Sequence, residues 1–328
     1  MSAAHVHFLG HSTLRLELGG VRVLTDPILR PVLGPLVRHG PVPDPATYAD
    51  LDLIVVSHLH LDHFDVPSLR LIPRGPVLVI PKGATGLLAG THHHDLVEML
   101  PGDAIQIRGL TVRATAAEHP GNRRPGGLDG VAMGFMLEAE GERVYFAGDT
   151  DLFPGMADLG SPDLAFLPVS GWGLTRGHGH LDPRDAAEAL TLIRPRAAIP
   201  IHWGTLWPRG MAAVGSERRT GAGPAFGRFA AELAPAVHVA VPQPGHRVSL
   251  AHVLTGPSVA GDPRHAPELW RAGIVVGRDR GGSGHEERPR PSRSGPFERQ
   301  RVSACTRRRP SRSGRSGPGH TASSRGPT

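Results

Sequence analysis

The chain has 328 residues, with 36 basic and 30 acidic side chains, 20 histidines and a single cysteine. It has no run of about 20 apolar residues, which a membrane-spanning helix needs, and no signal peptide pattern at its start. These features make a cytoplasmic location the default expectation. One cysteine excludes an intramolecular disulfide, which agrees with a reducing compartment.

The net charge of +6 is unevenly distributed along the chain. Residues 256–328 contain 15 arginines, no lysine and 6 acidic residues and carry +9, whereas residues 1–255 carry −3. The C-terminal segment is rich in Arg, Pro, Ser and Gly and has too few apolar residues to offset chain entropy. We therefore expect a folded domain over residues 1–255 and a disordered tail over 256–328. Nucleic acid is not an expected partner except through this tail, which is either a basic arm for nucleic acid or an anionic membrane or, as we favour, a dispensable extension.

Short strands and helices alternate along the predicted domain. An opening hairpin region, with a tight turn at Gly19-Gly20, leads into a longer series of elements. Strands are expected at His5–Phe8, Thr13–Leu18, Val21–Thr25, Leu53–Val56, Val77–Ile80, Ile105–Ile107, Thr111–Arg113, Val131–Glu138, Arg143–Phe146, Leu164–Pro168, Ala197–Ile201 and Val237–Val241. Helices are expected at Val66–Leu71, Gly83–Leu88, Phe153–Leu159, Pro183–Ile193 and Ala225–Leu233. This order predicts an α/β domain with two mixed sheets and outer helices.

The segment after the predicted strand Leu53–Val56 gathers three histidines and an aspartate within six residues, at His58, His60, Asp62 and His63. His58 and His60 are two positions apart, so extended backbone points both side chains toward one metal ion. Asp62 and His63 follow where the chain begins to turn, so they can face a second ion. Imidazole nitrogen and carboxylate oxygen both suit zinc. Grouping four such side chains without a bound cation would carry a desolvation cost.

Three later predicted strands are also followed by side chains that bind metals, at His119, Asp149 and His202. Taken singly, each pattern is weak, because a buried histidine is often part of a core and an aspartate often caps a turn or a helix. Together they supply the additional ligands that two adjacent metal ions require.

These motifs, taken in chain order, resemble those of the metallo-β-lactamase superfamily. The match comprises His58-x-His60-x-Asp62-His63, then His119, Gly148-Asp149-Thr150 and His202. Three further segments resemble one branch, the N-acyl-phosphatidylethanolamine phospholipase D-like and ascorbate-6-phosphate lactonase-like hydrolases: Phe8–Thr13, Leu24–Pro27 and Ile201–Thr205. The resemblance spans roughly residues 5–250 and implies a four-layer αββα sandwich.

The resemblance also implies a role for each ligand position. It assigns the first metal ion to His58, His60 and His119, the second to Asp62, His63 and His202, and the bridge between them to Asp149. Two divalent ions are expected, zinc above all, with manganese or iron as alternatives. A metal-bound hydroxide would attack a phosphodiester, a lactone or a related ester, and Asp62 would orient it or accept its proton. Asp149 stands where antibiotic-destroying lactamases commonly have cysteine, so we do not expect that activity.

Two classes of function follow from these features. The first is a metal-dependent hydrolase acting on a small-molecule ester or phosphodiester. Within it, the segment Ile201–Thr205 slightly favours a phospholipase D-like phosphodiesterase over a lactonase. The second is a non-enzymatic scaffold that binds a polyanion through its basic tail, but a scaffold would not need seven ligand-type side chains. The sequence leaves the oligomeric state open.

Other residues have candidate roles near the site. His180 precedes the predicted helix Pro183–Ile193, and the resembled branch often has a histidine there, so we expect it to contact the substrate or the leaving group as a catalytic residue. Asp26 and His11 are candidates to hydrogen-bond a ligand histidine, or alternatively to serve a turn and a strand end. Arg38 either contacts an anionic substrate or is solvated. Thr91–Asp95, with three consecutive histidines, is interpreted as a surface loop.

Overall fold

The structure is a computed structural model of the chain, and it describes residues 5–89, 95–121, 130–171, 179–211 and 215–255. All of these residues lie in one compact unit, Met1–Val276. The predicted disordered tail, residues 256–328, lies outside the described residues, so the predicted domain boundary stays a prediction.

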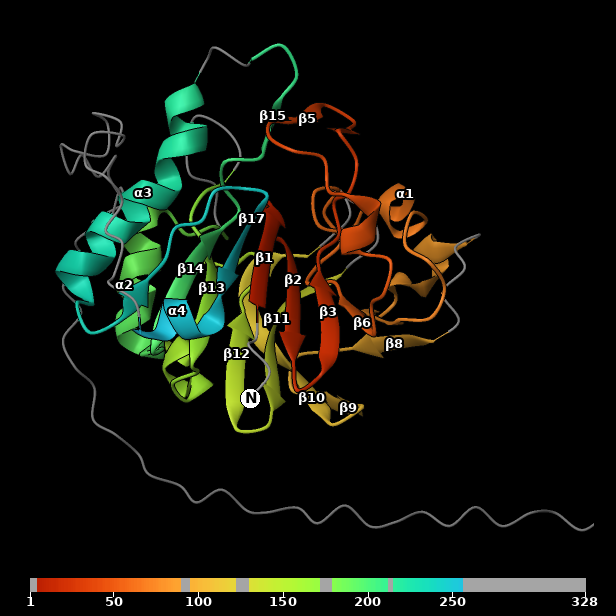
Figure 1. Cartoon of the computed structure of the whole chain (residues 1–328), viewed down its shortest axis with the longest axis horizontal. Coiled ribbons are helices and arrows are strands. Elements are labelled where there is room, and N and C mark those ends of the chain that lie inside the picture. The colour runs from red at the N-terminus through yellow and green to blue at the C-terminus, as the bar shows by residue number, and fades with distance from the viewer. Residues whose placement is uncertain (1–4, 90–94, 122–129, 172–178, 212–214, 256–328) are drawn as a thin grey trace, which may run out of the picture. The chain divides into compact units, whose positions relative to one another are not determined.

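Two seven-stranded mixed sheets form the centre of this unit (Figure 1). The first sheet has the order β17-β1-β2-β3-β6-β7-β8. Its strands are β1 (His5–Gly10), β2 (Thr13–Leu18), β3 (Val21–Thr25), β6 (Leu53–Val55), β7 (Val77–Pro81), β8 (Leu96–Met99) and β17 (His246–Ser249). Pairing is antiparallel from β17 to β3 and parallel from β3 to β8.

The second sheet has the order β16-β14-β13-β12-β11-β10-β9. Its strands are β9 (Ala104–Ile107), β10 (Leu110–Pro120), β11 (Val131–Ala139), β12 (Glu142–Phe146), β13 (Leu164–Pro168), β14 (Ala197–Ile201) and β16 (His238–Val239). Pairing is antiparallel from β9 to β12 and parallel from β12 to β16. Each sheet therefore contains parallel strands, whose carboxyl ends are favoured places for functional loops.

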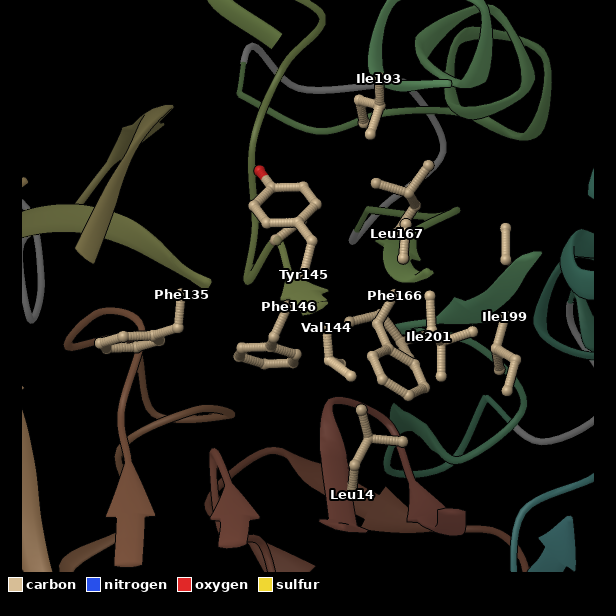
Figure 2. Close-up of a cluster of buried hydrophobic side chains, with 14 of the residues drawn as sticks. Leu14, Phe135, Val144, Tyr145, Phe146, Phe166, Leu167, Ile193, Ile199 and Ile201 are labelled. Carbon is tan, nitrogen blue, oxygen red and sulfur yellow. The ribbon is translucent and has the colours of Figure 1, made fainter. Parts of the chain in front are cut away.

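Strand alternation distributes apolar side chains to both faces of each sheet. In Figure 2, Phe146 and Phe166 point toward Leu14 of the first sheet, whereas Tyr145 and Leu167 point to the opposite side, where α2 (Pro183–Ile193) lies. All five side chains are fully buried. One core thus fills the space between the sheets, and a second apolar layer joins the second sheet to its helices.

The helices cover the outer faces of the sheets. Helix α2 packs against α3 (Ser216–Leu233) on one side, and α1 (Val66–Leu69) lies on the other side, with Leu69 packed in a cluster that includes Ile54 and Val56 (Figure 1). The remaining helical segments are α4 (Leu250–Thr255) and the 3₁₀ turns η1 (Pro45–Thr47), η2 (Ala84–Leu88) and η3 (Pro154–Leu159). The predicted αββα sandwich is confirmed. No helix in the described part of the chain is long and apolar enough to cross a membrane.

The ring of Phe166 lies in the core between the two sheets, so its removal tests this packing directly. Phe166→Ala is expected to lower the free energy of unfolding by about 3–5 kcal/mol, the usual cost of emptying a buried aromatic site. Urea denaturation measures the loss. Leu71→Ala is the control, because Leu71 is 48% exposed, and it should change stability by less than about 0.5 kcal/mol. Equal effects of the two substitutions would contradict the assigned core.

Several elements differ from their prediction. Helix α3 begins nine residues before the predicted Ala225, and Pro224 lies inside it. The segments 84–88 and 154–159 form 3₁₀ turns instead of α-helices. A small third sheet, missed by the sequence analysis, consists of β4 (Val32–Leu33), β5 (Leu36–Arg38) and β15 (Leu206–Pro208). Its strands are too short for alternation to be recognised, and β15 pairs with a strand far away in the sequence.

Candidate metal centre

Three imidazoles, here called the first triad, come together at His58, His60 and His119. The Nε2 atoms of His58 and His119 each lie 3.0 Å from Nδ1 of His60. Nitrogen ligands at 2.0–2.1 Å in tetrahedral geometry around zinc are separated by about 3.3 Å. The spacing of these nitrogens is therefore close to that of three ligands of one zinc ion.

A second triad, Asp62, His63 and His202, lies beside the first, within a group of possible ligands that also includes His11. Asp62 Oδ2 is 3.7 Å from His63 Nε2 and 3.5 Å from His202 Nε2. All three side chains are almost completely buried. The side chains predicted to bind the two ions thus lie in adjacent groups, and their assignment to one ion or the other stays a prediction.

Asp149 lies between the triads. Its Oδ2 atom is 3.2 Å from both His63 Nε2 and His202 Nε2, and 3.9 Å from His58 Nε2. Its Oδ1 atom is buried and has no hydrogen-bond partner among the described residues. A buried carboxylate oxygen without a partner carries a desolvation cost that a bound cation offsets. The donor set and this oxygen both fit a pair of metal ions.

Three of the ring nitrogens that face away from the centre have hydrogen-bond acceptors, those of His58, His63 and His119. His63 Nδ1 donates to Asp26 Oδ2 at 2.7 Å, and Ser57 Oγ donates to the same oxygen at 2.6 Å. Because the Ser57 proton is directed to Asp26, Ser57 Oγ accepts from His58 Nδ1 at 3.0 Å. His119 Nδ1 donates to the carbonyl oxygen of Gly179 at 2.6 Å. These contacts direct the three Nε2 atoms into the centre, and Asp26 makes the hydrogen bond to a candidate ligand histidine that was one of its two predicted roles.

Backbone strain is concentrated at the same place. Asp26, His11 and His202 have positive φ angles of 33°, 57° and 62°, a region that side chains other than glycine rarely occupy. Such residues cost of order 1–3 kcal/mol each and persist where the surrounding contacts hold them. His202 is held by its N–H, which donates to the carbonyl oxygen of His11 at 2.8 Å, and by Ser170 Oγ, which donates to its carbonyl oxygen.

The imidazoles of the two triads differ in the direction of their pKa shifts. Burial lowers the pKa of His119 to about 4 and, together with the neighbouring His63, lowers that of His58 well below its ordinary value. At His63 and His202 burial also acts to lower the pKa, but Asp149 and the other acids outweigh it. The pKa of His63 is therefore well above its ordinary range and that of His202 is about 9.

The two acids of the centre respond in the opposite direction. Burial acts to raise the pKa of Asp62 and Asp149, yet the adjacent imidazoles, His63 among them, hold both values well below the ordinary range. Both carboxylates are therefore charged at neutral pH, and protons on His63 and His202 balance them. Divalent cations can replace these protons.

Comparison with known proteins identifies the family. The family model for the β-lactamase superfamily domain matches residues 21–203, which is more than half of the chain. The chain belongs to the β-lactamase superfamily. A UPF0173 metal-dependent hydrolase of Thermus thermophilus is 34% identical over 205 residues, which cover 62% of this chain and 85% of that protein. An uncharacterised protein of Mycobacterium tuberculosis is 30% identical over 263 residues, 74% of this chain and 68% of its own length.

A solved structure agrees with this assignment. A metallo hydrolase from the archaeon Ignicoccus hospitalis has a TM-score of 0.56 and 24% sequence identity, over 75% of this chain and 97% of that one. This likeness supports the fold, while the family match and the Thermus thermophilus relative confirm the predicted superfamily and the predicted class of enzyme, a hydrolase. The finer assignment to the phospholipase D-like branch stays a prediction.

His180 lies beside Asp149, on the more exposed side of the candidate metal centre. Its Nε2 atom is 3.3 Å from Asp149 Oδ2, and its side chain is 14% exposed, whereas that of Asp149 is 1% exposed. The preceding Gly179 has φ 86°, and a Cβ atom there would lie 2.8 Å from His119 Nδ1. Asp182 fixes the other end of the loop, because its Oδ1 caps α2 by accepting from the N–H groups of residues 184 and 185.

The other candidate residues have different outcomes. Arg38 is buried and donates to the carbonyl oxygens of Leu9 and Ile28, so the expectation that it is solvated is wrong, whereas substrate contact stays a prediction. His11 contacts Asp62 Oδ2, and this long-range contact is evident only in the tertiary structure. The histidines at 92–94 lie outside the described residues.

Proposed function

We propose that this protein is a dinuclear hydrolase that cleaves an ester bond in a small molecule, with phosphodiesters as the favoured substrate class. The observation that carries the proposal is the pair of adjacent triads joined by the buried Asp149 Oδ2. Membership of a superfamily whose relatives include proteins named metal-dependent hydrolases supports the reaction class.

The residues present fit two divalent ions. The first triad would hold one ion and the second triad the other, with Asp149 shared between them. Imidazole and carboxylate donors suit zinc best and also accept manganese or iron. When bound, two such ions lower the pKa of water toward about 7 and polarise the oxygen of the scissile group.

Asp62 is the side chain that we assign to orienting the attacking water and accepting its proton. Its carboxylate is ionised, because the surrounding imidazoles hold its pKa well below the ordinary range against the effect of burial. A carboxylate has lone pairs on both oxygens and can accept a proton without moving. The short strand and turn that position it, Leu53–Val55 and the residues after it, are fully buried up to His58.

His180 is the side chain that we assign to the leaving group. It is more exposed than the buried imidazoles of the second triad, and contacts of Gly179 and Asp182 fix its loop. An imidazole in this position can donate a proton from Nε2 to the departing oxygen. The proton matters most when the leaving group is a poor one.

His180→Ala is therefore expected to lower kcat by about 10²- to 10⁴-fold for a substrate with a poor leaving group, the range of a lost general acid. The loss should be much smaller with bis-p-nitrophenyl phosphate, whose p-nitrophenolate departs without help. Steady-state kinetics on two phosphodiesters that differ only in the leaving group measure the difference, with metal content measured in parallel. Equal losses on both substrates would contradict this role. Loss of bound metal would contradict it as well and would make His180 a metal ligand.

The substrate class is tested with a panel of bis-p-nitrophenyl phosphate, an acyl lactone and nitrocefin. The segment Ile201–Thr205 favours the phosphodiester, because it resembles the phospholipase D-like branch. The expected result is turnover of the phosphodiester above the other two substrates, abolished by a chelator and restored by zinc. Turnover of the lactone alone would show that lactones, instead of phosphodiesters, are the substrate class. No turnover of any of the three substrates by protein carrying two metal ions would contradict the proposed hydrolase activity.

A further inference from the structure

His11 lies in the turn between β1 and β2, where the members of the second triad meet. It is 1% exposed and adopts a positive φ of 57°. Its ring centroid is 4.0 Å from that of His202 and 5.2 Å from that of His63. A buried, strained histidine in contact with two candidate ligands is not explained by the packing of a strand end.

Three polar contacts fix His11 in this place. Its Nε2 atom lies 3.1 Å from Asp62 Oδ2, its carbonyl oxygen accepts from the N–H of His202 at 2.8 Å, and its own N–H donates to Thr205 Oγ1 at 2.8 Å. Side chain and backbone of one residue therefore contact two members of the second triad.

These contacts join the two halves of the molecule. Asp62 follows β6 of the first sheet, whereas His202 follows β14 of the second sheet. The approach is close because Gly10 has no side chain: a Cβ atom there would lie 2.6 Å from Thr205 Oγ1. His11 is thus held tightly between the two segments that must meet to form one metal site.

We propose that His11 is a positioning residue for the second metal ion, which holds the carboxylate of Asp62 and the backbone of His202 in binding geometry without itself binding the ion. This inference rests on the proposed function. A neutral imidazole has one N–H, and the hydrogen bond to Asp62 places it on Nε2. The nitrogen nearest the second triad is thus used in the contact with Asp62.

Two substitutions separate positioning from direct binding. His11→Asn suits the backbone, because asparagine tolerates positive φ, but its side chain is too short to reach Asp62. His11→Gln places an amide N–H near the position of Nε2 and can restore the hydrogen bond, although a side-chain amide is a poor zinc ligand. His7→Asn is the matched control on the preceding strand β1, since His7 contacts the carbonyl oxygen of Gly245 away from the centre.

Zinc stoichiometry and affinity, measured by competition with a chromophoric chelator on the full chain, give the readout. His11→Asn is expected to bind one equivalent with normal affinity and the other about 10- to 100-fold more weakly, as for other residues that orient ligands. His11→Gln should recover most of this loss, and His7→Asn should match the original protein. Thermal unfolding by circular dichroism checks that each variant is folded.

Loss of one whole equivalent in both His11 variants would overturn the proposal, because it would make His11 a ligand. Unchanged affinity in His11→Asn would overturn it as well. If His11→Asn does not fold, His11→Gln decides alone, since positioning predicts retention of both equivalents and direct binding predicts loss of one. A failure of the unsubstituted protein to bind two equivalents would instead count against the proposed function.

Discussion

Asp149→Asn is expected to remove both metal ions and to abolish hydrolysis. Asp149 Oδ2 lies within 4 Å of Nε2 atoms from both triads, and asparagine takes away the negative charge there. Loss of a residue that only orients ligands reduces metal affinity about 10- to 100-fold, so loss of the shared carboxylate should exceed this range. Elemental analysis after dialysis gives the metal content, and steady-state kinetics give kcat.

The control for this experiment is Asp158→Asn, which makes the same chemical change on an exposed turn residue. It should leave metal content and kcat unchanged. Retention of two metal equivalents in Asp149→Asn, with the fold intact by circular dichroism, would show that Asp149 is not shared between the ions.

Asp62→Asn should lower kcat by about 10²- to 10⁴-fold, the range of a lost proton acceptor, while the protein stays folded and keeps the ion of the first triad. Asparagine is close in shape to aspartate but cannot accept the proton. The measurement is kcat together with metal content and the thermal unfolding curve. His246→Ala, at an exposed histidine of β17, is the control and should change almost nothing. Similar losses from both substitutions would mean that Asp62 has no special role.

The seven candidate ligand positions could be recognised in the sequence because each is part of a local pattern. Every one follows or ends a strand, and four lie within six residues of each other in the sequence. The two sheets were predicted for a similar reason, since their strands are apolar runs between turn residues. Asp26 was open between two interpretations because Pro27 makes any preceding aspartate a plausible turn residue. Its hydrogen bonds to His63 and Ser57 decide the matter.

What the sequence could not predict depends on tertiary contacts. His11 is separated from Asp62 by 51 residues and from His202 by 191, so no local pattern links them. The burial of Arg38 depends on the buried carbonyl oxygens of Leu9 and Ile28, to which its guanidinium group donates. The third sheet pairs β5 with β15, about 170 residues further along the chain. In each case the two partners are brought together by the tertiary fold, so the sequence contains no periodic pattern that predicts the contact.

A metal titration of the metal-free protein, with the rate of phosphodiester hydrolysis followed at each step, tests the central claim most directly. Two triads bridged by Asp149 predict that the rate rises with added zinc and reaches its plateau at two equivalents per chain. The protein should also be inactive before zinc is added. A plateau at one equivalent, or full hydrolytic activity in metal-free protein, would contradict the dinuclear hydrolase.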